Sequence, residues 1–213
     1  MSDVRRLGIV HTVSQLAPTF AELASELLPG VETTVIADDL LLKRTIRDGA
    51  IDDVTRDRLR GHVAALTEYG VDAVLVTCSS IGAVVDEIDS ETDIPVVRVD
   101  RAMAERAVTL GARVGVLATL PTTLAPTTEL IEAARAVEVV SRLCDGAFAA
   151  LQRGDHAQHD AIIAEELDRL AADVDVVVLA QASMARIAAA RAQGGTPVLS
   201  SPRLAMERLA CMG

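Results

Sequence analysis

The segment Val71-Asp-Ala-Val-Leu-Val-Thr-Cys-Ser-Ser-Ile-Gly82 recurs about a hundred residues later as Val174-Asp-Val-Val-Val-Leu-Ala-Gln-Ala-Ser-Met-Ala185. Both copies are apolar runs of strand length that end in small polar residues, the pattern of a buried parallel strand leading into a helix. At the turn where the first copy carries Cys78, the second copy carries Gln181. The chain is therefore predicted to be duplicated, with two halves that differ at one chemically decisive position.

Further pairs of segments repeat in the same order. Leu7-Gly-Ile-Val-His-Thr-Val13 is echoed by Val114-Gly-Val-Leu-Ala-Thr-Leu120, Val31-Glu32 by Val137-Glu138, and residues 94–106 by residues 196–208. Ordered duplication at nearly constant spacing predicts two similar halves related by a pseudo-twofold axis, with equivalent loops lining a shared site. We place the halves at residues 1–111 and 112–213, with Gly111 ending the first and a terminal helix free to cross over.

Strand-like runs alternate with longer helical patterns in both halves, which indicates an α/β fold. Strands are predicted near residues 5–12, 32–37, 73–77 and 96–99, then 113–118, 136–141, 176–180 and 198–200. Helices are predicted over residues 19–28, 52–69, 80–88 and 101–110, then 122–134, 155–172, 183–193 and 202–211. Each half is therefore expected to be a parallel sheet flanked by helices.

The composition of the 213-residue chain suits a small cytoplasmic enzyme or binding protein. A formal net charge of −11 repels phosphate backbones and anionic lipids, and one Tyr, two Phe and no Trp offer little stacking surface. We therefore expect neither a nucleic-acid partner nor a membrane partner. No apolar run approaches membrane-spanning length, and residues 1–6 lack the apolar core of a signal peptide. The three cysteines cannot all pair and none has metal-ligand spacing, so we expect reduced thiols and no metal.

Small side chains, most of them polar, follow the predicted strands at their carboxyl ends, the edge where ligands bind in parallel sheets. They are His11, Thr12, Cys78, Ser79, Ser80, Thr119, Thr122, Thr123, Gln181, Ala182 and Ser183. Several precede a helix, where free backbone N–H groups and the positive end of the helix dipole favour an anion. The set therefore suits a small carboxylate. The same position predicts a lowered pKa for the Cys78 thiol and a populated thiolate.

These residues also have structural interpretations. A cysteine after a buried strand is often a small core residue, and serines or threonines at helix starts are ordinary N-caps. His11 equally suits a satisfied, partly buried histidine. Two cysteines are expected to be structural and two histidines at a charged helix start to be solvated: Cys144, Cys211, His156 and His159. Cys78 is favoured because the duplication, the strand end, the helix start and the hydroxyl neighbours coincide there.

Three segments, in this order and with the duplication, resemble the aspartate/glutamate racemase superfamily, which includes hydantoin racemases, maleate isomerases and arylmalonate decarboxylases. They are Val76-Thr77-Cys78-Ser79-Ser80, Val116-Leu117-Ala118-Thr119-Leu120-Pro121-Thr122 and Leu179-Ala180-Gln181-Ala182-Ser183. The resemblance covers nearly the whole chain. It implies an enzyme without a cofactor that works at the carbon next to a carboxylate. In the racemases of this family two cysteines, one per half, flank that carbon and exchange its proton from opposite faces.

The resemblance also implies roles for individual residues. Cys78 matches the first-half cysteine, and Thr12 matches a hydroxyl residue after the first strand. Ser79 and Ser80 match a pair that binds the substrate carboxylate. Thr119 and Thr122 match second-half threonines that also bind it. His11 falls where glutamate racemases carry an acidic residue that assists the thiol. Gln181 takes the place of the second cysteine, and an amide has no useful pKa for proton transfer. In the arylmalonate decarboxylases one cysteine suffices, although it lies in the other half.

Three functions remain open from the sequence. The first is a racemase- or isomerase-like enzyme that acts next to the carboxylate of a small amino acid or dicarboxylate through Cys78, with water or His11 completing proton transfer and Gln181 orienting substrate or an oxyanion. The second is a decarboxylase of a small substituted dicarboxylate, in which Cys78 protonates the enediolate left by loss of CO₂. The third is a non-catalytic carboxylate-binding protein. We expect no cofactor, and a homo-oligomer that is most simply a dimer.

Overall fold

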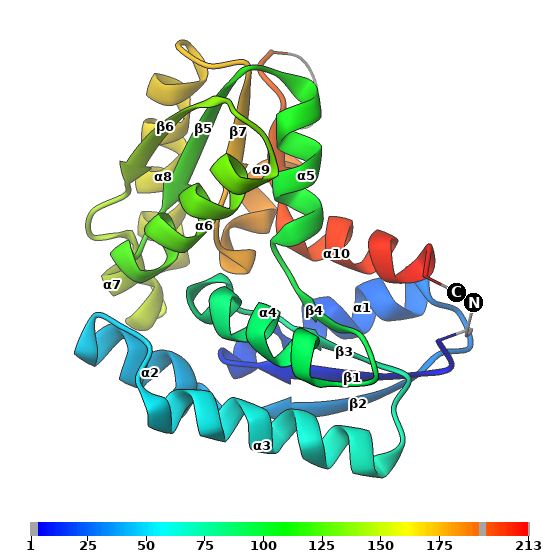
Figure 1. The fold of residues 1–213 in the computed structure, drawn as a ribbon. Helices are drawn as coiled ribbons and strands as arrows, with labels where there is room; N and C mark the ends of the chain where they lie inside the picture. The colour runs from blue at the N-terminus through cyan, green and yellow to red at the C-terminus, as the bar shows by residue number, and fades with distance from the viewer. Residues whose placement is uncertain (1–3, 192–194, 213) are drawn as a thin grey trace. The chain divides into compact units, whose positions relative to one another are not determined.

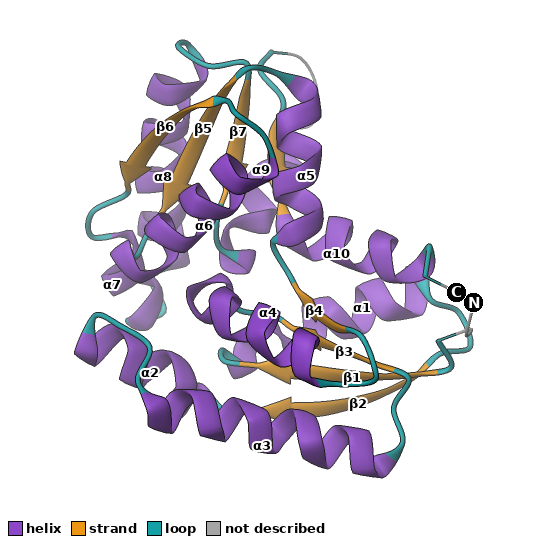
Figure 2. Ribbon diagram, viewed as in Figure 1, coloured by secondary structure: helices purple, strands orange, loops and turns teal. Residues whose placement is uncertain are grey.

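The computed structural model describes residues 4–191 and 195–212, and the chain forms two compact units (Figure 1). Unit 1 contains the described residues 4–99 and 202–212, and unit 2 contains Asp100–Ser201 apart from residues 192–194. Each unit holds one four-stranded parallel sheet flanked by helices (Figure 2). The predicted α/β class with two similar halves is confirmed.

The sheet of unit 1 has the strand order β2-β1-β3-β4. Its strands are β1 (Arg6–His11), β2 (Glu32–Ala37), β3 (Ala73–Val76) and β4 (Val96–Arg98). The central strands β1 and β3 are buried almost throughout, because their continuous apolar runs face helices on both sides of the sheet. Strand β2 lies at the edge and is largely exposed.

The helices of unit 1 are α1 (Ala17–Leu27), α2 (Asp39–Asp48), α3 (Asp53–Tyr69), α4 (Gly82–Glu91) and α10 (Ser201–Ala210), whose first residue belongs to unit 2. Right-handed crossovers place α1 on one face of the sheet and α3 and α4 on the other (Figure 1). Helix α3 packs closely on β1, since a Cβ added at Gly8 would lie only 2.9 Å from Leu66 Cδ1.

Unit 2 repeats this plan with the strand order β6-β5-β7-β8. Its elements are β5 (Arg113–Ala118), β6 (Glu138–Leu143), β7 (Val176–Leu179), β8 (Val198–Ser200), α5 (Arg101–Leu110), α6 (Pro121–Ala134), α7 (Ala147–Gln152), α8 (His156–Ala171) and α9 (Ala185–Ala190). Helix α6 covers one face, and α8 and α9 cover the other. A Cβ at Gly115 would lie 2.8 Å from Leu170 Cδ2, so even this close helix–strand approach is duplicated.

The structure differs from the sequence prediction in several elements. Helices α2 and α7 were not predicted, and they occupy equivalent places in the two units, between the second strand and the long helix. Strand β6 begins two residues later than predicted, at Glu138. Short 3-10 turns, η1 (Ser14–Leu16), η2 (Ser79–Ile81) and η3 (Ala182–Met184), precede α1, α4 and α9. The predicted end of the helix over 183–193 lies outside the described residues.

The division into units also differs from the boundary placed at residue 111. Helix α5 groups with unit 2 because it packs against α6, β7 and β8. Helix α10, at the other end of the chain, groups with unit 1. Each unit thus combines most of one repeat with one terminal helix of the other.

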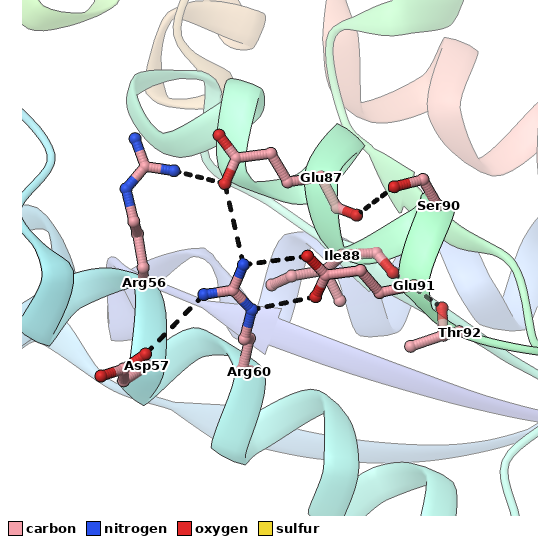
Figure 3. A network of polar contacts seen from close by, with 8 residues as sticks. All are labelled: Arg56, Asp57, Arg60, Glu87, Ile88, Ser90, Glu91 and Thr92. Atoms are coloured by element: carbon pink, nitrogen blue, oxygen red, sulfur yellow. Dashed lines mark hydrogen bonds and ion pairs between the residues drawn. The ribbon is translucent and has the colours of Figure 1, made fainter.

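Charged side chains tie α4 to α3 in unit 1 (Figure 3). Arg56 pairs with Glu87, and Arg60 Nε lies 3.0 Å from Glu91 Oε2. Arg60 also reaches Asp57, at 3.7 Å, within its own helix. One exposed pair contributes only about 0.2–1 kcal/mol, but the linked pairs together hold α4 against α3. Helix α4 follows η2 directly, so the network lies on the helix that comes after the Cys78 segment.

In unit 2 the equivalent helices α8 and α9 are also joined by ion pairs, but the acidic residues lie on the long helix and the basic residues come from the short one and its cap. Helix α8 supplies Asp160 and Asp168, whereas Arg186 and Arg191 come from α9 and its C-terminal cap. In unit 1 the arginines lie on the long helix and the glutamates on the short one. The helix–helix anchor is therefore common to both units although the residues that form it are not.

Candidate functional site

Cys78 lies at the carboxyl edge of the unit 1 sheet. It follows β3 after Thr77 and directly precedes η2, with extended backbone angles (φ −138°, ψ 114°). Residues 73–82 are all buried, and Cys78 itself is 7% exposed. The cysteine thus stands between a strand end and a helical start, as the sequence predicts.

The surroundings of the thiol act on its protonation in opposite directions. Burial raises the pKa of Cys78 above its ordinary value, and this effect dominates. The backbone N–H groups of Ser80 and Ile81 and the Ser80 hydroxyl favour the thiolate and so lower the pKa. The Thr12 hydroxyl acts in the same direction, although it has no hydrogen-bond partner among the described residues. The sequence-based expectation of a lowered pKa is therefore wrong in direction, because desolvation outweighs the helix start.

His11 and Thr12 end β1 beside the Cys78 segment. His11 is fully buried, and its Nδ1 lies 2.7 Å from Thr77 Oγ1. Its ring is tilted against Phe20, with the ring centroids 5.3 Å apart. Burial lowers the pKa of His11 to about 4, so the imidazole is neutral at physiological pH. Nε2 of His11 has no hydrogen-bond partner among the described residues.

Helix α2 anchors the loops at the same edge. The buried carboxylate of Asp38 caps α2 by accepting from the Leu40 N–H at 3.1 Å. It also accepts from His62 Nε2 of α3 at 2.6 Å. Asp39 accepts from the N–H of Ser14, in the loop after β1, at 3.0 Å. The helix absent from the prediction therefore joins α3 to the loop that follows Thr12.

Arg98, at the end of β4, is a buried residue outside the predicted site. Its Nη1 donates to Asp86 Oδ2 at 2.7 Å, and its side chain packs against Gly82 at the start of α4. A Cβ at Gly82 would contact the guanidinium at a distance that real side chains do not adopt. A comparison of the two repeats could have indicated this pair, because Gly82 and Arg98 are both replaced in the second half, by Ala185 and Ser200.

Gly82→Ala is expected to lower the free energy of unfolding by about 1–3 kcal/mol, because the buried guanidinium of Arg98 has little room to move away from the new methyl group. In an Arg98→Ser background, which reproduces the pair of the second half, the same change should cost much less. Urea denaturation of the four variants measures both effects. Gly61→Ala in α3 is the control, since a Cβ there meets no atom within 4 Å. Equal losses in both backgrounds would show that Arg98 is not the obstacle.

Gln181 and Thr119 contact each other at the carboxyl edge of the unit 2 sheet. Gln181 follows β7 after Ala180, and Thr119 follows β5. Gln181 Oε1 accepts from the backbone N–H of Thr119 at 2.5 Å and from its hydroxyl at 2.9 Å. The Gln181 side chain is partly exposed, whereas Thr119 is buried. Both hydrogen-bond donors of Thr119 are therefore engaged within the chain.

The other predicted residues of unit 2 surround this pair at the start of α6 and in η3. Helix α6 begins with Pro121 after the N-cap Leu120, so Thr122 and Thr123 lie in its first turn. The hydroxyl of Thr122 is buried and has no hydrogen-bond partner within the described parts of the chain. Ala182 and Ser183 belong to η3. Each unit thus gathers its own predicted residues at one sheet edge: His11, Thr12, Cys78, Ser79 and Ser80 in unit 1, and Thr119, Thr122, Thr123, Gln181, Ala182 and Ser183 in unit 2.

One expectation outside the predicted site is wrong. His159 is fully buried rather than solvated, and its Nδ1 lies 2.8 Å from Asp160 Oδ1 and 3.0 Å from Arg186 Nη2. Burial lowers its pKa. His156, in the same helix, is exposed as expected.

The two remaining cysteines differ in environment. Cys144 is fully buried in the core of unit 2, and burial raises the pKa of its thiol to about 12, so it is a core residue. Cys211 is exposed. No group of three His, Cys, Asp or Glu side chains within residues 4–191 and 195–212 is arranged to hold a metal ion. Over the same residues, no helix is both long and apolar enough to span a bilayer.

A family model described as Asp/Glu/Hydantoin racemase matches residues 10–209. The chain belongs to this family. The match extends across both units, so it includes the Cys78 and Gln181 segments, and it makes the protein a racemase- or isomerase-like enzyme. Among proteins of curated function, none matches the sequence.

Solved structures of racemases share the fold. A glutamate racemase from Thermus thermophilus in complex with beta-chloro-D-alanine is 17% identical with a TM-score of 0.76, and the match covers 100% of this chain and 81% of that one. A Pyrococcus horikoshii aspartate racemase homologue is 16% identical with a TM-score of 0.74, covering 98% of both chains. An allantoin racemase from Klebsiella pneumoniae is 18% identical with a TM-score of 0.72, covering 97% of this chain and 86% of that one.

Proposed function

We propose that this member of the Asp/Glu/hydantoin racemase family is a cofactor-independent isomerase that uses Cys78 as its one acid/base. Its substrate would be a small amino acid or dicarboxylate, and the reaction would take place at the carbon next to a carboxylate. The observation that carries the proposal is the place of Cys78, which follows β3, directly precedes η2 and is level with Thr12 after β1. The hydroxyls of Thr12 and Ser80 and the backbone N–H of Ile81 favour the ionised form of Cys78, and the buried Thr12 hydroxyl has no hydrogen-bond partner within the described residues.

In the forward step, the Cys78 thiolate removes the proton from the carbon beside the carboxylate. The C–H bond breaks, an S–H bond forms, and the electron pair passes into an enediolate. The raised pKa makes the thiolate scarce, but it also makes it a stronger base toward a weak carbon acid. Water completes the proton transfer, because His11 is neutral and has no proton to give in the working pH range, and Ser79 and Ser80 hold the carboxylate. The glutamate and allantoin racemases and the aspartate racemase homologue with this fold support a small substrate with a carboxylate or carbonyl at that carbon.

A decarboxylase is the second candidate, and the raised pKa of Cys78 is what favours it. A thiol that stays protonated at neutral pH is a ready proton donor. Loss of CO₂ from a substituted malonate would leave an enediolate, to which Cys78 would deliver its proton on one face. One acid is enough for that reaction, so Gln181 in place of a second thiol would cause no difficulty.

The dependence of kcat/KM on pH separates the two candidates. If the thiolate acts as the base, kcat/KM should keep rising with pH beyond about 8.5, the pKa of an unperturbed cysteine, because the raised pKa of Cys78 delays its ionisation. If the thiol acts as the acid, kcat/KM should fall over the same range. We expect the rise. A fall in kcat/KM at high pH that is present in wild type and lost specifically in Cys78→Ser would favour the lyase instead.

A screen by proton NMR in D₂O identifies the reaction class. Dicarboxylates, amino acids and substituted malonates are incubated with the protein at several pH values. Deuterium entering the carbon next to the carboxylate supports the proposal, and loss of CO₂ supports the decarboxylase. Binding without either change over the whole panel would leave a carboxylate-binding protein and overturn both.

A further inference from the structure

In both units, the threonine after one central strand is level with the residue after the other. Strand β1 pairs with β3 through Val10↔Val76, and β5 pairs with β7 through Leu117↔Leu179. Two residues further on, Thr12 is level with Cys78 and Thr119 is level with Gln181. The Thr119 hydroxyl donates to Gln181 Oε1, whereas the buried Thr12 hydroxyl has no hydrogen-bond partner in the part of the chain that the structure describes. The duplicated threonine is therefore level with its neighbour across the sheet in each unit, and in unit 2 it also donates hydrogen bonds to that neighbour.

The two hydrogen bonds from Thr119 define the orientation of the Gln181 amide. A backbone N–H can only donate, so the atom 2.5 Å from the Thr119 nitrogen must be Oε1 and not Nε2. The hydroxyl hydrogen of Thr119 is directed to the same oxygen, at 2.9 Å. The Nε2 group, with two hydrogens, therefore points away from Thr119. Because Gln181 is partly exposed, that group is not enclosed by the unit 2 core.

We propose that Thr119 is a positioning residue that holds Gln181, and that the Nε2 hydrogens of Gln181 supply the substrate contact that Thr119 would otherwise make. Each donor hydrogen of Thr119 is already directed at a good acceptor, so a substrate carboxylate could use them only by displacing the amide. A neutral NH₂ group accepts a carboxylate, amide or enediolate oxygen but exchanges no proton with carbon. The contact to substrate rests on the proposed function, whereas the hold of Thr119 on Gln181 does not.

The hold can be tested without a substrate. In ¹⁵N-labelled protein, the side-chain amide of Gln181 should be ordered, with heteronuclear NOE values well above those of the exposed Gln15, Gln152 and Gln158. Thr119→Val should bring Gln181 close to these exposed glutamines, and Thr119→Ser should preserve its order. Thr128→Val, which removes a hydroxyl from the exposed side of α6, is the control and should change nothing. A Gln181 amide that is mobile in wild type, or unaffected by Thr119→Val, overturns the proposal.

The substrate contact is tested with a double-mutant cycle on the best compound from the D₂O screen. Thr119→Val alone is expected to lower kcat/KM about tenfold. In a Gln181→Leu background it should have almost no further effect, because Thr119 would act only through Gln181. Equal losses of kcat/KM in both backgrounds would show that Thr119 binds the substrate directly. A gain in kcat/KM for Gln181→Leu would show that the Gln181 side chain obstructs substrate binding. Either result overturns the proposal. If no compound turns over, the proposed function fails while the NMR order of Gln181 still decides the hold.

Discussion

Cys78→Ser is expected to lower kcat for proton exchange by roughly 10²–10⁴-fold, the range that a positioned acid/base contributes. A serine hydroxyl stays protonated over the whole working range, so it replaces the shape of the thiol but not its proton chemistry. The serine oxygen would lie at the same buried place between β3 and η2 and is smaller than sulfur, so it needs no rearrangement of the surrounding residues. The fold should therefore be kept. Deuterium incorporation measures kcat, and circular dichroism during thermal unfolding measures the stability.

Cys211→Ser is the matched control, since it removes an exposed thiol from α10's C-terminal end and should leave the exchange rate unchanged. If Cys78→Ser retained more than about a tenth of the wild-type rate, Cys78 would not be the acid/base. If both variants lost activity together with stability, the loss would lie in folding and not in chemistry. The unfolding curves separate these outcomes.

The sheets could be predicted closely because their physical signal is local. A strand buried on both faces must be apolar throughout, and β3 and β7 are short continuous runs of that kind bounded by polar residues. Helix α2 was missed although Asp38 caps it and Gly49 ends it in a left-handed conformation (φ 68°). These signals were present in the sequence, but the apolar residues between them form only a short run. The 3-10 turns depend on packing at the sheet edge, which no local pattern specifies.

The residues of the candidate site could be predicted from the sequence, but the protonation of Cys78 and the orientation of the Gln181 amide could not. The duplication shows that Cys78 and Gln181 are equivalent positions, and the strand ends show which polar side chains gather around them. The pKa of Cys78 depends on how much water remains beside the sulfur, and that follows from the packing of residues 73–82. The direction of the Gln181 amide likewise depends on the register of β5 against β7. Both are properties of contacts between distant parts of the chain.

The two units place different side chains, Cys78 and Gln181, at equivalent positions of the same scaffold. A strand-end threonine is level with a thiol in unit 1 and with an amide in unit 2. The thiol can carry a proton, whereas the amide donates and accepts hydrogen bonds but exchanges no proton in the working pH range. A symmetric racemase would need a proton carrier at both positions. The asymmetry predicts that proton exchange with solvent through Cys78 is faster for one enantiomer of a chiral substrate than for the other.

Gln181→Glu should be the sharpest test of what unit 2 contributes. A carboxylate oxygen of glutamate can still accept from both donors of Thr119, so the side chain should keep its place. The group that points away changes from an NH₂ donor to a negatively charged oxygen, which repels a substrate carboxylate and an enediolate. We expect kcat/KM to fall by at least the roughly 10²–10³-fold typical of losing one donor to developing charge. Gln181→Leu, which removes the donor without adding charge, should lose less.

The dependence of this loss on pH identifies its cause. As pH falls toward about 4.3, the pKa of an unperturbed glutamate, the new side chain gains a proton and can donate one hydrogen bond again. The ratio of kcat/KM for Gln181→Glu to that of wild type should therefore rise as pH falls, whereas the ratio for Gln181→Leu should stay flat. Taking the ratio cancels the ionisation of Cys78, which is common to all three proteins. If Gln181→Glu kept kcat/KM within threefold of wild type at neutral pH, the amide of Gln181 would not face the reacting substrate.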